Sequence, residues 1–187
     1  MPPSPLDTLD SGLNWLSAAL VRATKDLRSP FRWPVFCTRD GRGRTVVLRR
    51  VNAGSLNCHL FTDRRSPKVA ALRDAPEAEL VFFDPARMVQ LRVRGEVRII
   101  SQGPTWQATL AGLSQNALSD YTQPAGPGRP RADADDASEE TVSAAETFTL
   151  LDLTPQVIDL LHLGRQGHRR AEYHRDGQTW QGAWLVP

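Results

Sequence analysis

Residues 44–52 read RTVVLRRVN, residues 59–68 read HLFTDRRSPK and residues 88–100 read MVQLRVRGEVRII. The third segment alternates in a regular way. Its apolar residues fall at every second position, with Gly95 among them: Val89, Leu91, Val93, Val97 and Ile99. Its polar residues occupy the positions between: Gln90, Arg92, Arg94, Glu96 and Arg98. This pattern predicts a long β-strand with one buried face and one polar face.

Shorter strand-like segments surround this strand. They are WPVFCTR (33–39), RTVVLRRV (44–51), LNCHLFT (56–62), residues 77–83, FTLLDL (148–153), HRRAEYH (168–174) and WQGAWLV (180–186). Turn chemistry separates several of them, as at Asp40-Gly41-Arg42-Gly43 and at Asp84-Pro85. Many short strands predict a mainly β protein of the α+β class, a small antiparallel barrel with flanking helices. A doubly wound parallel fold would need longer helices that alternate with the strands.

The expected helices are few. Leucines at helical spacing predict a packing helix over residues 7–27, with Asp7 or Asp10 as its cap. We also expect a short helix from Ser66-Pro67-Lys68, one over residues 104–120 and one between Pro155 and Leu163. Residues 124–147 combine Pro, Gly, Ala and acidic side chains, and they predict a long loop or insertion.

Composition limits the class of protein. A chain of 187 residues with a net charge of +2 fits one domain, residues 1–187. It has no apolar stretch of membrane-spanning length, and its first residues lack a secretion signal, so we expect a cytoplasmic protein. The two cysteines, Cys37 and Cys58, lack the spacing of zinc ligands, and we expect reduced thiols and no metal. Interspersed acidic residues argue against nucleic-acid binding.

Basic residues gather around one predicted helix start. The first turn of a helix exposes unpaired N–H groups that suit an anion, and Ser66 and Lys68 would add a hydroxyl and a charge. Arg44 or Arg49, on the preceding strand, would approach from the other side. The alternative for Ser66-Pro67-Lys68 is an ordinary helix cap. Gln90 is open to two interpretations, a solvated side chain or an amide that bonds the edge of a ring.

Four motifs occur in the order and spacing of one family. They are Arg44-Thr-Val-Val-Leu-Arg49, Phe61-Thr62-Asp63, Ser66-Pro67-Lys68 and Val89-Gln90-Leu91. Together with HRRAEY and the tryptophan-rich C-terminal strand, they resemble the pyridoxamine 5′-phosphate oxidase family. The resemblance implies a split β-barrel and a homodimer with flavin mononucleotide (FMN) at the subunit interface. It also implies an FMN-dependent oxidoreductase that acts on a small-molecule substrate.

The resemblance carries site residues over to this chain. Arg44, Ser66 and Lys68 would hold the FMN phosphate, and Gln90 and Arg170 would contact the ring. The full set of implied cofactor contacts is Arg44, Thr45, Val46, Val47, Arg49, Phe61, Thr62, Ser66, Pro67, Lys68, Gln90, Gln123 and Arg170. Substrate contacts would fall to Arg49 and His168. No side chain is assigned as a catalytic acid or base.

The departures from the family concern charge. Pro67 stands where the family has an arginine, and Arg64 or Arg65 could replace that cation. Most of the residues that grip the substrate phosphate in the family are missing, and His168 remains. The sequence therefore leaves two hypotheses open: an oxidoreductase with an altered substrate site, or a protein that binds FMN or another anion without turnover.

Overall fold

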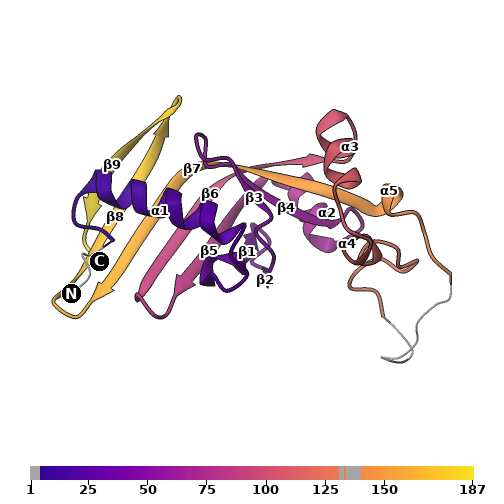
Figure 1. Ribbon diagram of the computed structural model, residues 1–187, viewed down its shortest axis with the longest axis horizontal. Helices are drawn as coiled ribbons and strands as arrows, with labels where there is room; N and C mark the ends of the chain where they lie inside the picture. Colours follow the sequence, from indigo (N-terminus) through magenta and orange to yellow (C-terminus); the bar gives the residue numbers. More distant parts are fainter. Residues whose placement is uncertain (1–4, 131–132, 134–139) are drawn as a thin grey trace.

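The computed structural model describes residues 5–130, 133 and 140–187, and its strands form one antiparallel sheet (Figure 1). Seven strands follow the order β2–β1–β5–β6–β7–β4–β3, and β8 and β9 extend the sheet from β7. The strands are β1 (Val35–Thr38), β2 (Gly43–Thr45), β3 (Arg50–Val51), β4 (Cys58–Asp63), β5 (Glu77–Asp84), β6 (Val89–Ile100), β7 (Phe148–Gly164), β8 (Gly167–Asp176) and β9 (Thr179–Leu185). The helices are α1 (Leu9–Ala23), the 3₁₀ turn η1 (Pro30–Arg32), α2 (Pro67–Asp74), α3 (Pro104–Ala111), α4 (Gln115–Ser119) and α5 (Ala144–Thr147).

Strand β6 has the faces that its alternation predicts. Val89, Leu91, Val93 and Val97 are buried, and the arginines between them are exposed or half-buried. The buried face packs into the core with residues of the neighbouring strands β5 and β7, among them Leu80 and Leu160. The mainly β class with flanking helices is therefore confirmed.

Strand β7 pairs with three other strands. One edge pairs with β6, while the other edge pairs first with β4 and then with β8. The helix predicted between Pro155 and Leu163 is wrong, because these residues continue β7. Ile158 and Leu160 face the core, and Asp159 between them faces the polar side of the sheet. This is the alternation of a strand, which the short apolar run in the sequence made hard to recognise.

A bulge accommodates Pro155 within β7. The register against β6 shifts between Arg94 and Gly95. A Cβ at Gly95 would lie 1.9 Å from the carbonyl oxygen of Thr154, so only glycine fits this close approach. Proline is tolerated here because a bulge interrupts the regular ladder of hydrogen bonds.

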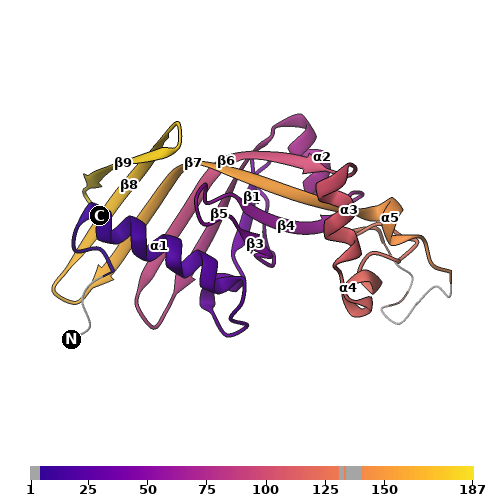
Figure 2. The ribbon, with the colours of Figure 1, turned by 45° about the horizontal axis from the view of Figure 1, so that its top comes forward.

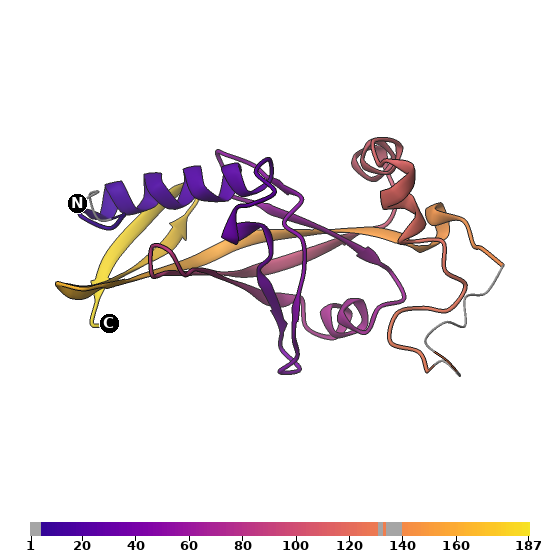
Figure 3. The same cartoon turned by 60° about the horizontal axis from the view of Figure 1, so that its bottom comes forward.

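Helix α1 covers one face of the sheet and crosses the strands from β8 toward β5 (Figures 1 and 2). Its buried residues include Leu16 and Leu20, as the leucine spacing predicts. The helix begins after Thr8, which forms a capping box with Ser11, so the caps predicted at Asp7 or Asp10 are wrong. In Figure 3, α1 and α2 lie on opposite sides of the long β7 ribbon.

Two further expectations need correction. The strand predicted over residues 44–51 is interrupted, since β2 ends at Thr45 and β3 begins at Arg50. The helix predicted over residues 104–120 is two helices: α3 ends at Ala111, with Gly112 as its C-cap, and Ser114 caps α4.

Of the loop expected at residues 124–147, the described positions 124–130, 133 and 140–143 have no helix or strand, and α5 occupies 144–147. Residues 131–132 and 134–139 lie outside the described residues. Cys37 and Cys58 are free thiols, as expected. Among the described residues, no helix is both long and apolar enough to span a bilayer.

Candidate functional site

A cavity of about 210 Å³ lies between β4 and the segment of residues 44–49. This segment is paired with β4 only at its end. The backbone N–H of Arg49 still donates to the carbonyl of His59, at 3.0 Å. The N–H groups of Val46 and Leu48 instead bond the carbonyls of Pro34 and Arg32, which draws the chain away from β4. The cavity is lined by Arg44, Thr45, Val46, Val47, Arg49, Leu60, Phe61, Thr62, Lys68 and Leu151.

Lys68 is held in this cavity by two hydroxyl groups. Its Nζ donates to Oγ1 of Thr62 at 2.9 Å and to Oγ of Ser66 at 2.7 Å. Burial lowers the pKa of Lys68 below its ordinary value, the Arg44 charge lowers it further, and Asp63 acts in the opposite direction. The shift shows that Lys68 lies in a partly desolvated position near a second cation, where an anion would be stabilised.

Arg44 is positioned by strand β1. Its Nη1 donates to Oγ1 of Thr38 at 2.7 Å and to the carbonyl of Phe36 at 3.4 Å. Both partners are neutral oxygens, so these bonds orient the guanidinium without neutralising it. Arg44 and Lys68 thus place two positive charges on one cavity.

The first turn of α2 lies next to the cavity and carries Lys68. Ser66 is its N-cap residue and Pro67 its first helical residue, as the sequence predicts. The hydroxyl of Ser66 makes no capping bond to the helix backbone and instead accepts from Lys68. Ser66 is 4% exposed, so this hydroxyl serves the lysine rather than bulk water.

Aromatic side chains close one side of the cavity. The guanidinium of Arg49 lies 5.6 Å from the ring centroid of Phe61, within the range of a cation–π contact. Phe61 in turn meets Phe148 edge-to-face, with centroids 5.4 Å apart. The cavity therefore combines a cationic end with an apolar wall.

Gln90 and Arg170 lie elsewhere, on the polar face of the sheet. The register places Gln90 opposite Leu161 and Leu161 opposite Arg170, so the three residues form a row across β6, β7 and β8. Neighbouring strands are about 4.8 Å apart, so the backbones of Gln90 and Arg170 are about 10 Å apart. A flat ring could lie over Leu161 between them.

Arg170 is distant from the Phe61 side of the cavity. Along β7, Phe61 of β4 is opposite Leu150, and Arg170 of β8 is opposite Leu161. Eleven residues of strand separate these two positions, or about 35 Å at 3.3 Å per residue. Figure 1 shows the same separation, with β4 and α2 well away from β8 along β7.

Arg170 is paired with a carboxylate. Its Nη2 lies 2.7 Å from Oδ2 of Asp159, and its Nε also donates to that group. Arg92 lies 3.8 Å from the same oxygen and forms a second ion pair with Glu79. The cation that the resemblance assigns to the ring is therefore fixed and partly neutralised by its own chain.

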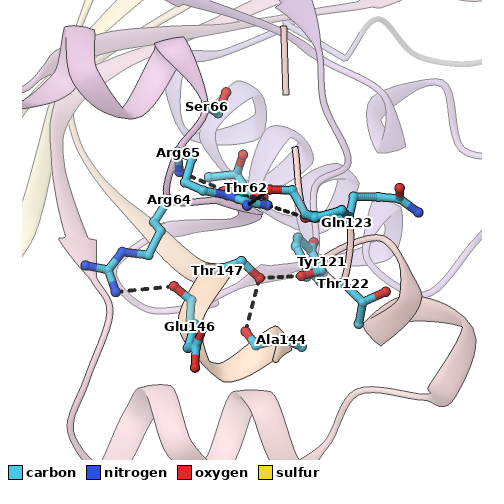
Figure 4. A network of polar contacts seen from close by, with 12 residues as sticks. Thr62, Arg64, Arg65, Ser66, Tyr121, Thr122, Gln123, Ala144, Glu146 and Thr147 are labelled. Atoms are coloured by element: carbon cyan, nitrogen blue, oxygen red, sulfur yellow. Dashed lines mark hydrogen bonds and ion pairs between the residues drawn. The ribbon is translucent and has the colours of Figure 1, made fainter. Parts of the chain in front are cut away.

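Arg64 and Arg65, the candidates for the cation missing at Pro67, both bond other parts of the chain. Arg65 pairs with Asp63 and donates to the carbonyls of Gln123 and Pro124, while Arg64 donates to the carbonyl of Glu146 (Figure 4). Arg65 is already paired with a carboxylate, and the replacement by Arg64 stays a prediction.

Gln123 and His168 lie outside the cavity. Gln123 borders a separate hollow with Asp63, Asp120 and residues 125–129. His168 is exposed near the β7–β8 turn, opposite Leu163.

Sequence reasoning missed several residues of the site. Leu60 and Leu151 line the cavity, and Thr38 orients Arg44. Asp159, which holds Arg170, lies in the segment misread as a helix. The strand-like alternation of Ile158, Asp159 and Leu160 was the available signal for that pairing.

Known proteins resemble the chain in sequence. Residues 15–101 match the family model described as the FMN-binding domain of pyridoxamine 5′-phosphate oxidase. A pyridoxine/pyridoxamine 5′-phosphate oxidase of Deinococcus deserti is 37% identical over 91 residues, which are 47% of this chain and 40% of that protein. The chain thus matches less than half of the length of this curated relative.

Solved structures extend the likeness to the whole chain. A pyridoxamine 5′-phosphate oxidase-related, FMN-binding protein of Nostoc punctiforme has a TM-score of 0.74 and 25% identity, with all of both chains covered. PhzG of Burkholderia lata, solved with tetrahydrophenazine-1-carboxylic acid, shares the fold with a TM-score of 0.61 and 21% identity, over all of this chain and 94% of that one. The resemblance and the split-barrel fold predicted from the motifs are confirmed.

Proposed function

We propose that this chain, whose residues 15–101 belong to the FMN-binding family of pyridoxamine 5′-phosphate oxidase, binds FMN and acts as an oxidoreductase on a small molecule. The observation that carries the proposal is the cavity beside β4. Eight of the residues predicted as cofactor contacts line it: Arg44, Thr45, Val46, Val47, Arg49, Phe61, Thr62 and Lys68.

The residues of the cavity fit a phosphate ester. Lys68 and Arg44 bond neutral oxygens, so their charges are available to an anion. Ser66 and the first turn of α2 add a hydroxyl and the positive end of a helix dipole. Arg44, Ser66 and Lys68 would hold the phosphate, and the backbone of residues 45–47 would follow the ribityl chain.

Two copies of the chain complete the proposed site. A single mononucleotide cannot reach across the roughly 35 Å of β7 that separates Phe61, at the wall of the cavity, from Arg170. In a homodimer, one subunit would hold the phosphate while its partner contributes this row to the ring. The separation within one chain thus supports a cofactor shared at the subunit interface.

FMN supplies two-electron redox chemistry when bound, with the substrate as donor and oxygen or another acceptor as the final oxidant. This chain would position the ring: the Gln90 amide offers both a donor and an acceptor, and Leu161 gives an apolar surface beneath it. Asp159 holds Arg170 in place and offsets its charge. The loss of most residues that grip the substrate phosphate in the family supports a substrate other than the vitamin B6 phosphate esters.

The missing substrate-binding residues also favour a second candidate, a protein that binds FMN without turnover. His168, which the resemblance assigns to the substrate, is exposed near a turn outside the cavity, so it is not set up to grip an anionic substrate there. The two candidates share the cofactor site and differ only in whether the bound flavin is reduced and reoxidised.

The visible absorption spectrum of the purified protein, with FMN added if it is colourless, tests the proposal. Saturable binding of flavin is expected, and no binding at micromolar FMN would overturn it. Bleaching by NADPH or an amine, followed by recovery in air, would identify an oxidoreductase. A bound flavin that none of these donors reduces would favour the binding protein.

A further inference from the structure

Arg65 joins two segments that are far apart in the sequence (Figure 4). One is the turn between β4 and α2, residues 62–68, which carries Thr62, Ser66 and Lys68. The other is the run from residue 121 to residue 129, which we call the strap. Nη1 of Arg65 donates to the carbonyl of Pro124 and Nη2 to that of Gln123, each at 2.8 Å.

The same guanidinium is anchored to the turn. Its Nη2 lies 2.6 Å from Oδ2 of Asp63 and its Nε lies 3.0 Å from Oδ1. Asp63 is 5% exposed whereas the Arg65 side chain is 31% exposed, so the carboxylate is buried and the guanidinium extends from it toward the surface. Asp63 thereby fixes the direction in which Arg65 reaches the strap.

The backbone of the strap packs directly on the turn. A Cβ at Gly126 would lie 3.1 Å from Cβ of Arg65, and one at Gly128 would lie 3.5 Å from Cγ of Pro67. Gly128 also has a φ of +82°, which favours glycine. The strap therefore lies against both Arg65 and the first residue of α2.

The strap is also bonded to Thr147, the residue directly before β7. The hydroxyl of Thr147 donates to the carbonyl of Tyr121, and the N–H of Arg64 donates to the carbonyl of Thr147 at 2.6 Å. Residues 62–68 thus contact the strap directly through Arg65 and indirectly through Thr147.

Asp63 links these contacts to the ligand-binding groups. Its carbonyl accepts from the N–H of Ser66 at 3.1 Å, and its carboxylate accepts from the N–H of Arg65 at 2.7 Å. The preceding residue, Thr62, accepts from Lys68. A shift of the Asp63–Arg65 pair would therefore move Ser66 and Lys68 together with the strap.

We infer that Arg65 is a positioning residue that couples the strap to the ligand-binding turn, so that binding of a phosphate ester and ordering of the strap favour each other. The inference rests on the proposed function, because it takes FMN as the ligand. Coupling between two sites is reciprocal: a ligand that stabilises the turn stabilises the strap by the same free energy.

Hydrogen exchange of the backbone amides of Gln123, Ala125, Gly126 and Gly128, measured with and without FMN, tests the coupling. In the wild-type protein we expect FMN to slow this exchange. In Arg65→Ala the FMN-dependent slowing should disappear, and FMN affinity should fall by about fivefold or more. Arg64→Ala is the matched control: its side chain contacts Glu146 rather than the strap, and the slowing should persist.

The outcomes separate the inference from the proposed function. If flavin absorbance shows that FMN binds, but strap exchange is unchanged or is slowed equally in Arg65→Ala, the coupling is wrong and the proposed function stands. If the wild-type protein binds no FMN, both are wrong. Arg65→Met, which keeps much of the side-chain volume and removes the hydrogen-bond donors, replaces Arg65→Ala if that variant does not fold, and the same loss of slowing is expected of it.

Discussion

The Nζ of Lys68 lies 2.9 Å from Oγ1 of Thr62, and this bond ties the first turn of α2 to the end of β4. The ammonium is therefore oriented by the protein before any ligand arrives. Preorganised charge of this kind costs little reorganisation on binding. Thr62, one residue before the end of β4, thus holds the lysine of the helix that follows.

Replacement of Lys68 by Met should weaken FMN binding by about 10- to 150-fold, since a charge-assisted hydrogen bond contributes about 1.5–3 kcal/mol. Met keeps much of the side-chain volume and removes the charge. Fluorescence titration of FMN measures the change. Lys25→Met, which alters the other lysine, is the control, and equal affinity of Lys68→Met and wild type would refute the phosphate assignment.

The pH dependence should also reveal Lys68. Burial and the Arg44 charge lower its pKa from the ordinary 10.5, so FMN affinity should fall as the pH rises through the lowered value. In that same window the unfolded chain binds more protons than the folded one, so the ligand-free protein should gain stability as the pH rises. Titrations and urea unfolding across this range, with Lys68→Met as reference, should show opposite trends that the variant lacks.

Local patterns predicted much of the fold. The alternation of residues 89–99 fixed β6 and its buried face, and Ser66-Pro67 fixed the start of α2. The path of β7 was beyond such reasoning, because its second half is apolar on both sides of Asp159 and depends on pairing with β6 and β8. The bulge at Gly95 likewise follows from contact with Thr154, which is distant in sequence.

The site divides in the same way. The residues that line the cavity belong to short motifs, and their positions follow from neighbours along the chain. The pairing of Arg170 with Asp159 and the attachment of Arg65 to the strap depend on tertiary structure, and no spacing rule reveals them. Sequence therefore predicted which residues gather at the cavity but not which arginines are already paired within the chain.

Asp152 should stabilise the folded protein at neutral pH. Hydrogen bonds from His59, and also from Asn57 and Arg98, lower its pKa from 3.8 to about 2, against the effect of burial. The resulting stability, roughly 2 kcal/mol, is fully present above pH 3.8 and is lost as the pH falls through about 2. Urea unfolding at pH 7 should show Asp152→Asn less stable than wild type. The exposed Asp74→Asn should behave as wild type, and equal stability of all three would contradict the assignment.

Gly95→Ala should destabilise the protein by about 1–3 kcal/mol or more, because the new methyl group would meet the backbone of Thr154 at 1.9 Å. Backbone atoms at the bulge cannot rotate away as a flexible side chain could. Gly54→Ala is the control, since its nearest neighbour would be the Asn52 side chain at 3.5 Å. Chemical denaturation compares them, and a small equal effect at both sites would show that the bulge relaxes.

Mixed dimers test whether two subunits share each FMN. Lys68→Met should impair the phosphate end of the site and Gln90→Ala combined with Arg170→Ala the ring end, so each homodimer should bind FMN weakly. If the ends come from different subunits, a heterodimer of the two variants has one site with all the changes and one intact site. It should bind about one FMN per dimer with wild-type affinity. Co-expression with two affinity tags, followed by flavin titration, measures this stoichiometry. A heterodimer with no tight site would mean that each chain builds its site alone. The roughly 35 Å between Phe61 and Arg170 along β7 would then contradict the assignment of both residues to one FMN.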